Sequence, residues 1–153
     1  MKKFDLNFYS GKRVLVTGHT GFKGTWLCRL LLNMGAQVTG YSLQPPTEPS
    51  IFGLAGMDRQ MNSITGDIRN LDRLLEVFRE NRPEIVLHLA AQPIVRESYK
   101  NPVYTYETNV MGTVNILECI RQTDSVRSFL NVTTDKVYHN REWEWGYRED
   151  DPL

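Results

Sequence analysis

Three glycines recur at every third position in the stretch from Val14 to Gly24. Gly18 allows a tight turn after a short β-branched and aliphatic run, Gly21 lets the backbone approach a pyrophosphate, and Gly24 lets a following helix pack close to the strand. The free N–H groups and the dipole of that helix would receive negative charge. The pattern predicts a strand, a turn and a helix that bind a phosphate-bearing ligand. A glycine-rich turn that binds nothing is the alternative.

A second group of residues that could do chemistry, Thr134, Asp135 and Lys136, comes directly after the stretch from Val126 to Thr133. The three residues bring a hydroxyl, a carboxyl and an amine together directly after an expected strand. Side chains of these kinds serve as hydrogen-bond donors and as general acids and bases. An ordinary turn that closes a strand has the same composition, so the triplet taken by itself leaves both interpretations open.

Five expected strands alternate with helical segments and position these residues. The strands are expected at 12–17, 37–43, 61–65, 84–90 and 126–133. The helical segments are marked by Trp26 to Met34 ending at Gly35, by Leu71, Leu74, Leu75 and Phe78, and by Tyr106, Val110, Val114 and Leu117. Three prolines between Gln44 and Ser50 exclude a helix or a central strand there. The alternation predicts an α/β fold with a doubly wound parallel sheet and right-handed crossovers.

The carboxyl ends of parallel strands meet at one edge of such a sheet, where ligands bind. Candidate functional residues follow four of the five expected strands: 18–24, 66–68, 89–92 and 133–136. One crevice at this edge is therefore expected to collect them.

The composition excludes several classes of protein. With 153 residues, 41% of them hydrophobic, the chain is most simply one domain. Lysine plus arginine equals aspartate plus glutamate at 18 each, so no overall charge favours nucleic acid or a membrane surface. No apolar run approaches the roughly 20 residues of a membrane span, which favours a cytoplasmic protein. Cys28 and Cys119 have no metal-ligand spacing, and we expect both to be core residues without a disulfide or a metal.

The sequence resembles the extended short-chain dehydrogenase/reductase family and, within it, the sugar-nucleotide 4,6-dehydratases of the type that acts on CDP-glucose. The glycine pattern is the G-x-x-G-x-x-G form of that family. The resemblance covers nearly the whole chain and is carried by the blocks 11–24, 45–47, 88–93, 108–113, 132–136 and 142–150.

The resemblance implies NAD as the cofactor and assigns residues to its parts. Gly18, Thr20, Gly21, Phe22, Lys23 and Gly24 would surround the pyrophosphate, Asp67 and Ile68 would border the adenine, and Leu89, Ala90, Ala91 and Thr108 would line the nicotinamide side. Two of these assignments have structural alternatives: Asp67 as a cap of the helix that starts near Asn70, and Ala90 with Ala91 as tight core packing. Asn109 is interpreted as a structural hydrogen-bonding residue.

The resemblance also implies the reaction, which converts CDP-D-glucose to CDP-4-dehydro-6-deoxy-D-glucose within deoxysugar and O-antigen synthesis. Transient oxidation at C4 makes the C5 proton acidic, so that water can be lost across C5–C6. Thr134 would bond the C4 oxygen, Asp135 would protonate the departing C6 hydroxyl, and Lys136 would act as the base at C5. A homo-oligomer is implied as well.

Two departures from the family pattern qualify these expectations. A Tyr-x-x-x-Lys pair does not occur before Leu153, which predicts that residues 1–153 are the N-terminal, cofactor-binding part and are inactive alone. A non-catalytic dinucleotide-binding module is the alternative. The second expected strand ends Gly40 to Gln44 without the acidic residue that often bonds the adenine ribose, so NAD is inferred from the resemblance. Trp143, Trp145 and Tyr147 would pack on the substrate or cover the edge of the core.

Overall fold

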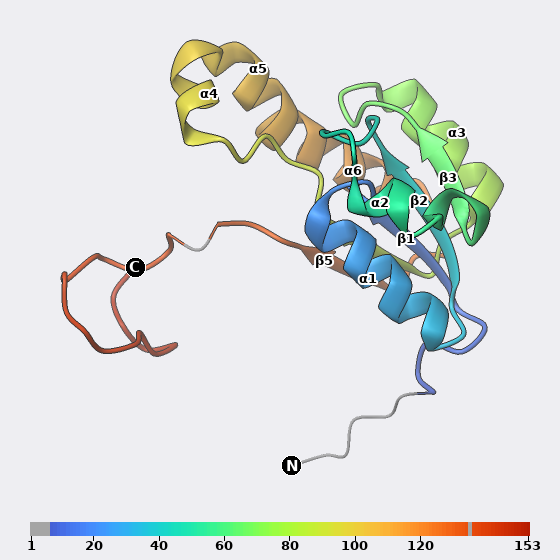
Figure 1. Ribbon diagram of the computed structural model, residues 1–153, viewed down its shortest axis with the longest axis horizontal. Helices are drawn as coiled ribbons and strands as arrows, with labels where there is room; N and C mark the ends of the chain where they lie inside the picture. Colours follow the sequence, from blue (N-terminus) through green and yellow to red (C-terminus); the bar gives the residue numbers. More distant parts are fainter. Residues whose placement is uncertain (1–6, 135) are drawn as a thin grey trace.

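The computed structural model describes residues 7–134 and 136–153, and a single parallel sheet organises them (Figure 1). Its five strands lie in the order β3-β2-β1-β4-β5. They are β1 Arg13–Thr17, β2 Gln37–Ser42, β3 Asn62–Thr65, β4 Ile85–His88 and β5 Ser128–Asn131. The strand order reverses between β1 and β4, which both pair in parallel. The expected doubly wound parallel sheet is confirmed.

Helices cover both faces of the sheet. On one face lie α1 Phe22–Asn33, α2 Ile51–Leu54 and the 3₁₀ turn η1 Met57–Arg59; on the other lie α3 Leu71–Asn81 and α6 Gly112–Arg121. Two short helices, α4 Val95–Lys100 and α5 Pro102–Tyr106, project beyond the sheet (Figure 1). A single turn of π-helix, η2 Glu107–Met111 (the π-turn), joins α5 to α6.

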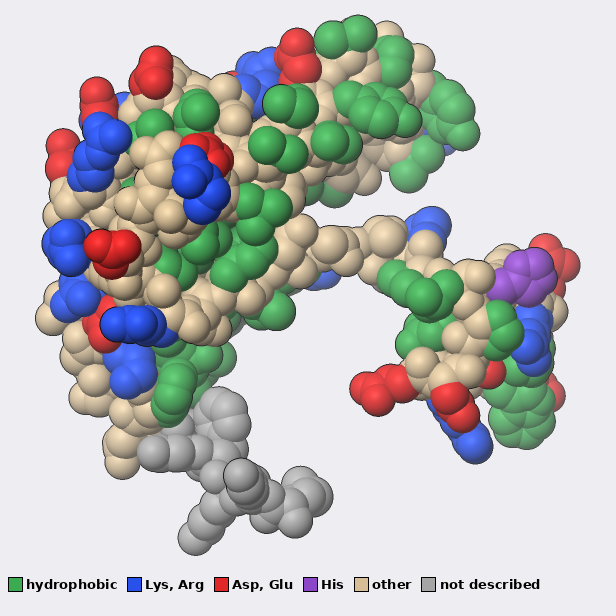
Figure 2. Space-filling model, turned by 180° about the vertical axis from the view of Figure 1, so that it is seen from behind, with side chains coloured by type: hydrophobic (Ala, Val, Ile, Leu, Met, Phe, Trp, Pro, Cys, Tyr) green, Lys and Arg blue, Asp and Glu red, His purple; other side chains and the backbone are tan. Residues whose placement is uncertain are grey.

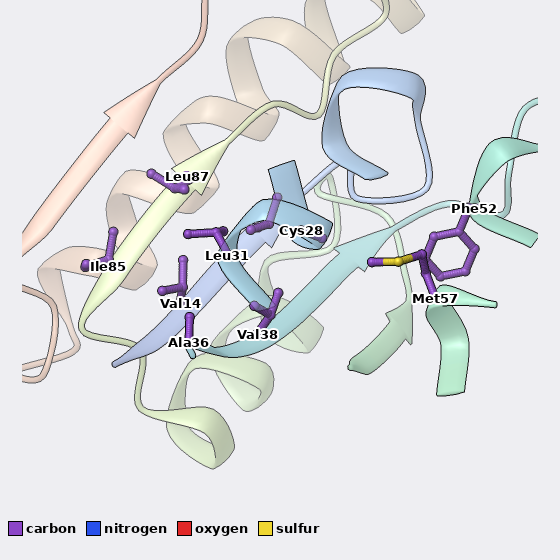
Figure 3. Close-up of a cluster of buried hydrophobic side chains, with 10 residues drawn as sticks. Val14, Cys28, Leu31, Ala36, Val38, Phe52, Met57, Ile85 and Leu87 are labelled. Carbon is purple, nitrogen blue, oxygen red and sulfur yellow. The ribbon is translucent and has the colours of Figure 1, made fainter. Parts of the chain in front are cut away.

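Two separate hydrophobic cores result from the alternation of side chains along the strands. Val14 and Val16 face α1, and Leu15 between them faces α3 and α6. Figure 3 shows the first of these cores, in which Cys28 of α1 lies among strand side chains. Cys119 belongs to the second core, and both cysteines are fully buried. The expectation that they are core residues is confirmed, and they lie on opposite faces of the sheet.

The long helical stretch from Pro102 to Arg121 exposes the residues that mark it in the sequence. Tyr106, Val110, Val114 and Leu117 retain between 46% and 68% of their accessible surface. The buried residues of this stretch are Thr108, Gly112, Ile116 and Cys119. The helix was predicted correctly, but the apolar pattern marks its exposed side. Figure 2 shows a related gathering of hydrophobic side chains over the projecting part of the molecule, where Val95, Tyr99 and Val103 are exposed.

The segment after β5 leads away from the sheet (Figure 1). Its aromatic residues contact one another: Tyr138 stacks on Tyr147 with ring centroids 5.2 Å apart, and Trp143 lies 5.6 Å from Tyr147. Trp145 is 70% exposed. Among the described residues, Tyr138, Trp143 and Tyr147 therefore form a cluster of their own, and none of the segment's aromatic residues packs against either core. No helix in the described part of the chain has the length and apolar character needed to cross a bilayer.

Candidate functional site

The turn between β1 and α1 has no room for side chains at two of its glycines. Gly18 has φ +73°, and a Cβ there would lie 2.8 Å from the backbone nitrogen of Ala90. A Cβ at Gly24 would lie 2.1 Å from the carbonyl oxygen of Gly18. The first glycine is therefore required for the backbone conformation and the third for the close approach of α1 to the turn, as the spacing predicted.

The free N–H groups at the amino end of α1 have neither a capping side chain nor an acidic residue beside them. Gly21 is the N-cap residue and supplies no side-chain hydrogen bond, and the first turn contains no acidic residue. Lys23 in that turn is exposed. Such an end offers donors, a positive dipole and a cationic side chain, which is the arrangement that binds phosphate groups.

Thr20 is tied to the second strand. Its hydroxyl lies 2.8 Å from that of Ser42 and donates to the carbonyl of Leu43 at 3.0 Å. Since Thr20 is 9% exposed, its side chain fixes the turn against the end of β2. Any direct contact with a ligand is therefore left to its backbone.

Asp67 and Ile68 follow β3 and have different surroundings. Arg69 binds both carboxylate oxygens of Asp67, with contacts of 2.7–3.1 Å, and also pairs with Glu107 at 3.1 Å. The hydrogen bonds from Arg69 lower the pKa of Asp67. Asn70, and not Asp67, caps α3, so the capping alternative is wrong. Ile68 is buried beneath Gly112, where a Cβ would lie 2.5 Å from its Cδ1.

The segment after β4 is held from two sides. The hydroxyl of Thr17 accepts hydrogen bonds from the backbone nitrogens of Leu89 and Ala90, both at 3.1 Å. Asn109 bonds both backbone groups of Gln92, which confirms its structural role. Ala90 packs at the margin of the second core and against Gly18, so the tight-packing interpretation holds for it.

Among the described residues, Thr108 and His19 each have a buried side-chain polar atom without a hydrogen-bond partner, and Thr108 lies beside the candidate site. It is 8% exposed, and its hydroxyl has no hydrogen-bond partner among the described residues. Buried hydroxyls are rarely left in this state, so an acceptor or donor supplied by a ligand fits the position.

The structure brings the residues after β1, β3 and β4 to one edge of the sheet, and among the described residues no hydrogen bond joins Thr134 or Lys136 to them. Both are exposed, in the segment that leads away from β5, and the backbone nitrogen of Lys136 donates to the hydroxyl of Thr134 at 3.1 Å. Asp135 lies outside the described residues. The described residues contain no group of three or more side chains suited to hold a metal ion.

Two buried histidines were missed by the sequence analysis. Nε2 of His19 lies 2.7 Å from the hydroxyl of Ser63, and burial lowers the pKa of His19 to about 4. Its ring occupies the space over Gly40, where a Cβ would lie 2.3 Å from the imidazole Cγ. An isolated glycine inside a strand signals such an approach, so Gly40 was the available clue. His88, at the end of β4, is buried in the same way, and its pKa is also lowered to about 4.

The strand order of this parallel sheet reverses beside the glycine turn, and an uncapped helix, α1, follows that turn. This combination defines a domain of the Rossmann type. The family model described as GDP-mannose 4,6 dehydratase matches residues 15–153, and the chain belongs to this family.

Two curated relatives place the chain more closely. It is 54% identical to the CDP-glucose 4,6-dehydratase of Salmonella typhimurium over 149 residues, which are 97% of this chain and 42% of the relative. It is 32% identical to a UDP-glucose 4-epimerase of Klebsiella pneumoniae over 82% of this chain and 91% of that relative. The chain thus spans less than half the length of the Salmonella enzyme.

Solved structures share the fold. The epimerase Mth375 from Methanothermobacter thermautotrophicus matches with a TM-score of 0.77 and 27% identity, over 95% of this chain and 42% of that one. The UDP-glucose 4-epimerase from Brucella ovis in complex with NAD matches with a TM-score of 0.64 and 30% identity, over 78% of this chain and 35% of that one.

Proposed function

We propose that the protein containing this chain is a CDP-glucose 4,6-dehydratase, which converts CDP-D-glucose to CDP-4-dehydro-6-deoxy-D-glucose. The observation that carries the proposal is the 54% identity, over 97% of this chain, to the Salmonella enzyme of that name. Residues 1–153 would be its NAD-binding domain. The complete protein would act in the cytoplasm as a homo-oligomer in deoxysugar synthesis.

The cofactor proposed is NAD, which fits the space limits at the glycine turn and the unpartnered hydroxyl of Thr108. When bound, NAD would take hydride from C4 of the sugar and return it at C6. The backbone from Gly18 to Gly24, including Thr20, Gly21, Phe22 and Lys23, would bind the pyrophosphate. Asp67, whose carboxylate is held by Arg69, and Ile68 would border the adenine. Leu89, Ala90, Ala91 and Thr108 would line the nicotinamide side.

Three consecutive residues after β5 would carry the elimination. The hydroxyl of Thr134 would donate to the C4 oxygen, the carboxyl of Asp135 would protonate the leaving C6 hydroxyl, and the amine of Lys136 would remove the C5 proton. Thr134 and Lys136 are exposed in the segment beyond β5, so no packed side chain blocks either of them from a substrate. The amine of Lys136 must be neutral to act as a base, so the complete site would have to desolvate it.

The test uses the protein expressed from the complete reading frame that encodes this chain. It is incubated with CDP-glucose and NAD, and the 4-keto product is measured. Product formation supports the proposal, and UDP-glucose and GDP-mannose are the control substrates. NAD binding without turnover of any of the three would favour the alternative of a non-catalytic dinucleotide-binding module. The exposed positions of Thr134 and Lys136 are compatible with that alternative.

A further inference from the structure

A chain of hydrogen bonds passes through the buried imidazole of His88. Nδ1 lies 2.6 Å from the hydroxyl oxygen of Thr17 at the end of β1. Nε2 lies 3.3 Å from the hydroxyl oxygen of Thr113 in α6. The Thr113 hydroxyl in turn lies 2.7 Å from the backbone carbonyl of Asn109 in the π-turn. These hydrogen bonds therefore connect β1, β4 and α6 at the edge of the sheet where the candidate site lies.

The direction of every bond in this chain is fixed by its neighbours. The Thr17 oxygen already accepts from the backbone nitrogens of Leu89 and Ala90, so its own proton must go to Nδ1 of His88. At the other end the Asn109 carbonyl can only accept, so the Thr113 hydroxyl donates to it and accepts from His88. His88 must therefore be neutral, with its proton on Nε2.

We propose that His88 is a positioning residue, which holds the backbone of 89–92 in place for the nicotinamide half of the cofactor through this directed hydrogen-bond chain. The other end of the same segment is held by Asn109, whose side chain bonds both backbone groups of Gln92. A single tautomer of His88 thus couples the end of β1 to the π-turn that carries Asn109 and Thr108. The inference rests on the proposed function, because the proposed function assigns residues 89–91 of this segment to the nicotinamide side.

Binding of NAD and of ADP-ribose, which lacks nicotinamide, separates positioning from a general structural role. In the complete protein, Thr113→Val removes the acceptor for Nε2–H, and we expect it to weaken NAD binding about fivefold, the effect of one hydrogen bond, while ADP-ribose binding changes less than twofold. Thr113→Ser should restore NAD binding. The matched control is Thr123→Val, because the Thr123 hydroxyl donates to the carbonyl of Cys119 in the same manner but outside the chain through His88.

The tautomer is read directly from ¹⁵N shifts of the complete protein labelled at histidine, with His88 assigned from the spectrum of His88→Gln. A neutral ring with its proton on Nε2 at pH 7 is expected, and a proton on Nδ1 or a charged ring overturns the inference. Equal weakening of NAD and ADP-ribose by Thr113→Val, or no weakening of either, also overturns it. Failure of the unaltered protein to bind NAD is a different result, because it overturns the proposed function while the tautomer is measured independently.

Discussion

The side-chain amide of Asn109 bonds both backbone groups of Gln92: its Oδ1 accepts from the Gln92 nitrogen at 2.7 Å, and its Nδ2 donates to the Gln92 carbonyl at 3.0 Å. Gln92 is 9% exposed, so water is poorly placed to replace either bond. One side chain of the π-turn therefore fixes the path of the chain as it leaves the end of β4 toward α4.

Asn109→Ala should destabilise the protein by about 2 kcal/mol, because it leaves two buried backbone groups without partners. Urea unfolding followed by circular dichroism measures the change. Asn140→Ala is the control: Asn140 makes a comparable bond to the backbone nitrogen of Glu142, but in an exposed segment, so the change should stay within about 0.5 kcal/mol. Equal effects of the two substitutions would contradict the argument from burial.

Gly24→Ala should destabilise by about 3 kcal/mol and abolish NAD binding, because the new methyl group cannot fit beside the Gly18 carbonyl without moving α1 away from the turn. Thermal unfolding and cofactor titration are the measurements. The control is Gly146→Ala, since nothing lies within 4 Å of a Cβ at that position. Retention of normal cofactor binding by Gly24→Ala would show that the close approach is not needed.

Stability should fall as the pH is lowered from about 6.5 toward 4. The pKa values of His19 and His88 are both lowered to about 4 by burial, against an ordinary value of 6.5. In this window the unfolded chain takes up protons that the folded chain excludes, so each histidine costs about 1.4 kcal/mol per pH unit. Asp67 and Glu118, whose pKa values are lowered, begin to contribute only below their unfolded values, near pH 4.

Urea unfolding at pH 7, 6 and 5 measures this slope. His19→Gln and His88→Gln should each reduce it by about half within this histidine-dependent window. His139→Gln is the control, because His139 is exposed. A slope that neither buried-histidine variant changes would contradict the assignment.

NAD should bind more tightly than NADP, by about tenfold or more, because a 2′-phosphate normally requires an arginine partner. The end of β2 and the residues after it, 41–44, contain none, and the Ser42 hydroxyl there is already bonded to Thr20. Titration of the complete protein with both cofactors tests this, and Gln44→Arg should narrow the difference. Equal or tighter NADP binding by the unaltered protein would refute the prediction.

Asp135→Asn should stop the reaction after oxidation at C4. The amide keeps the shape of the side chain but is too weak an acid to protonate the departing C6 hydroxyl, so turnover should fall about 10²–10⁴-fold. Reduced cofactor should then accumulate and be visible as absorbance on mixing enzyme, NAD and substrate. The matched variant Thr134→Val should accumulate less, because it impairs the oxidation. Normal turnover, or lost activity without reduced cofactor, would place Asp135 outside the elimination step.

The sheet and the glycine turn could be predicted because their signals are local: Gly18 follows an apolar run directly, and the backbone clash at Gly24 depends on residues only six positions away. The hydrogen bonds through His88 could not be predicted, because they join residues 71 apart on one side and 25 apart on the other. The pairing of β1 with β4 brings Thr17 to His88, and the packing of α6 on the sheet brings Thr113 to it. The exposed side of α6 was missed for a related reason. The sequence shows two apolar sides, and packing against Ile68 and Leu74 decides which is buried.

The π-turn at Glu107–Met111 holds one residue more than regular helical winding would place there. Each residue of an α-helix is rotated by about 100° about the helix axis relative to the residue before it. Loss of a single residue from this turn would therefore rotate α5 and α4 by that angle about the axis, while α6 stayed packed on the sheet. The same loss would carry Asn109 away from Gln92. Length variation at this one place would therefore re-aim the projecting helices without altering any residue of the two cores.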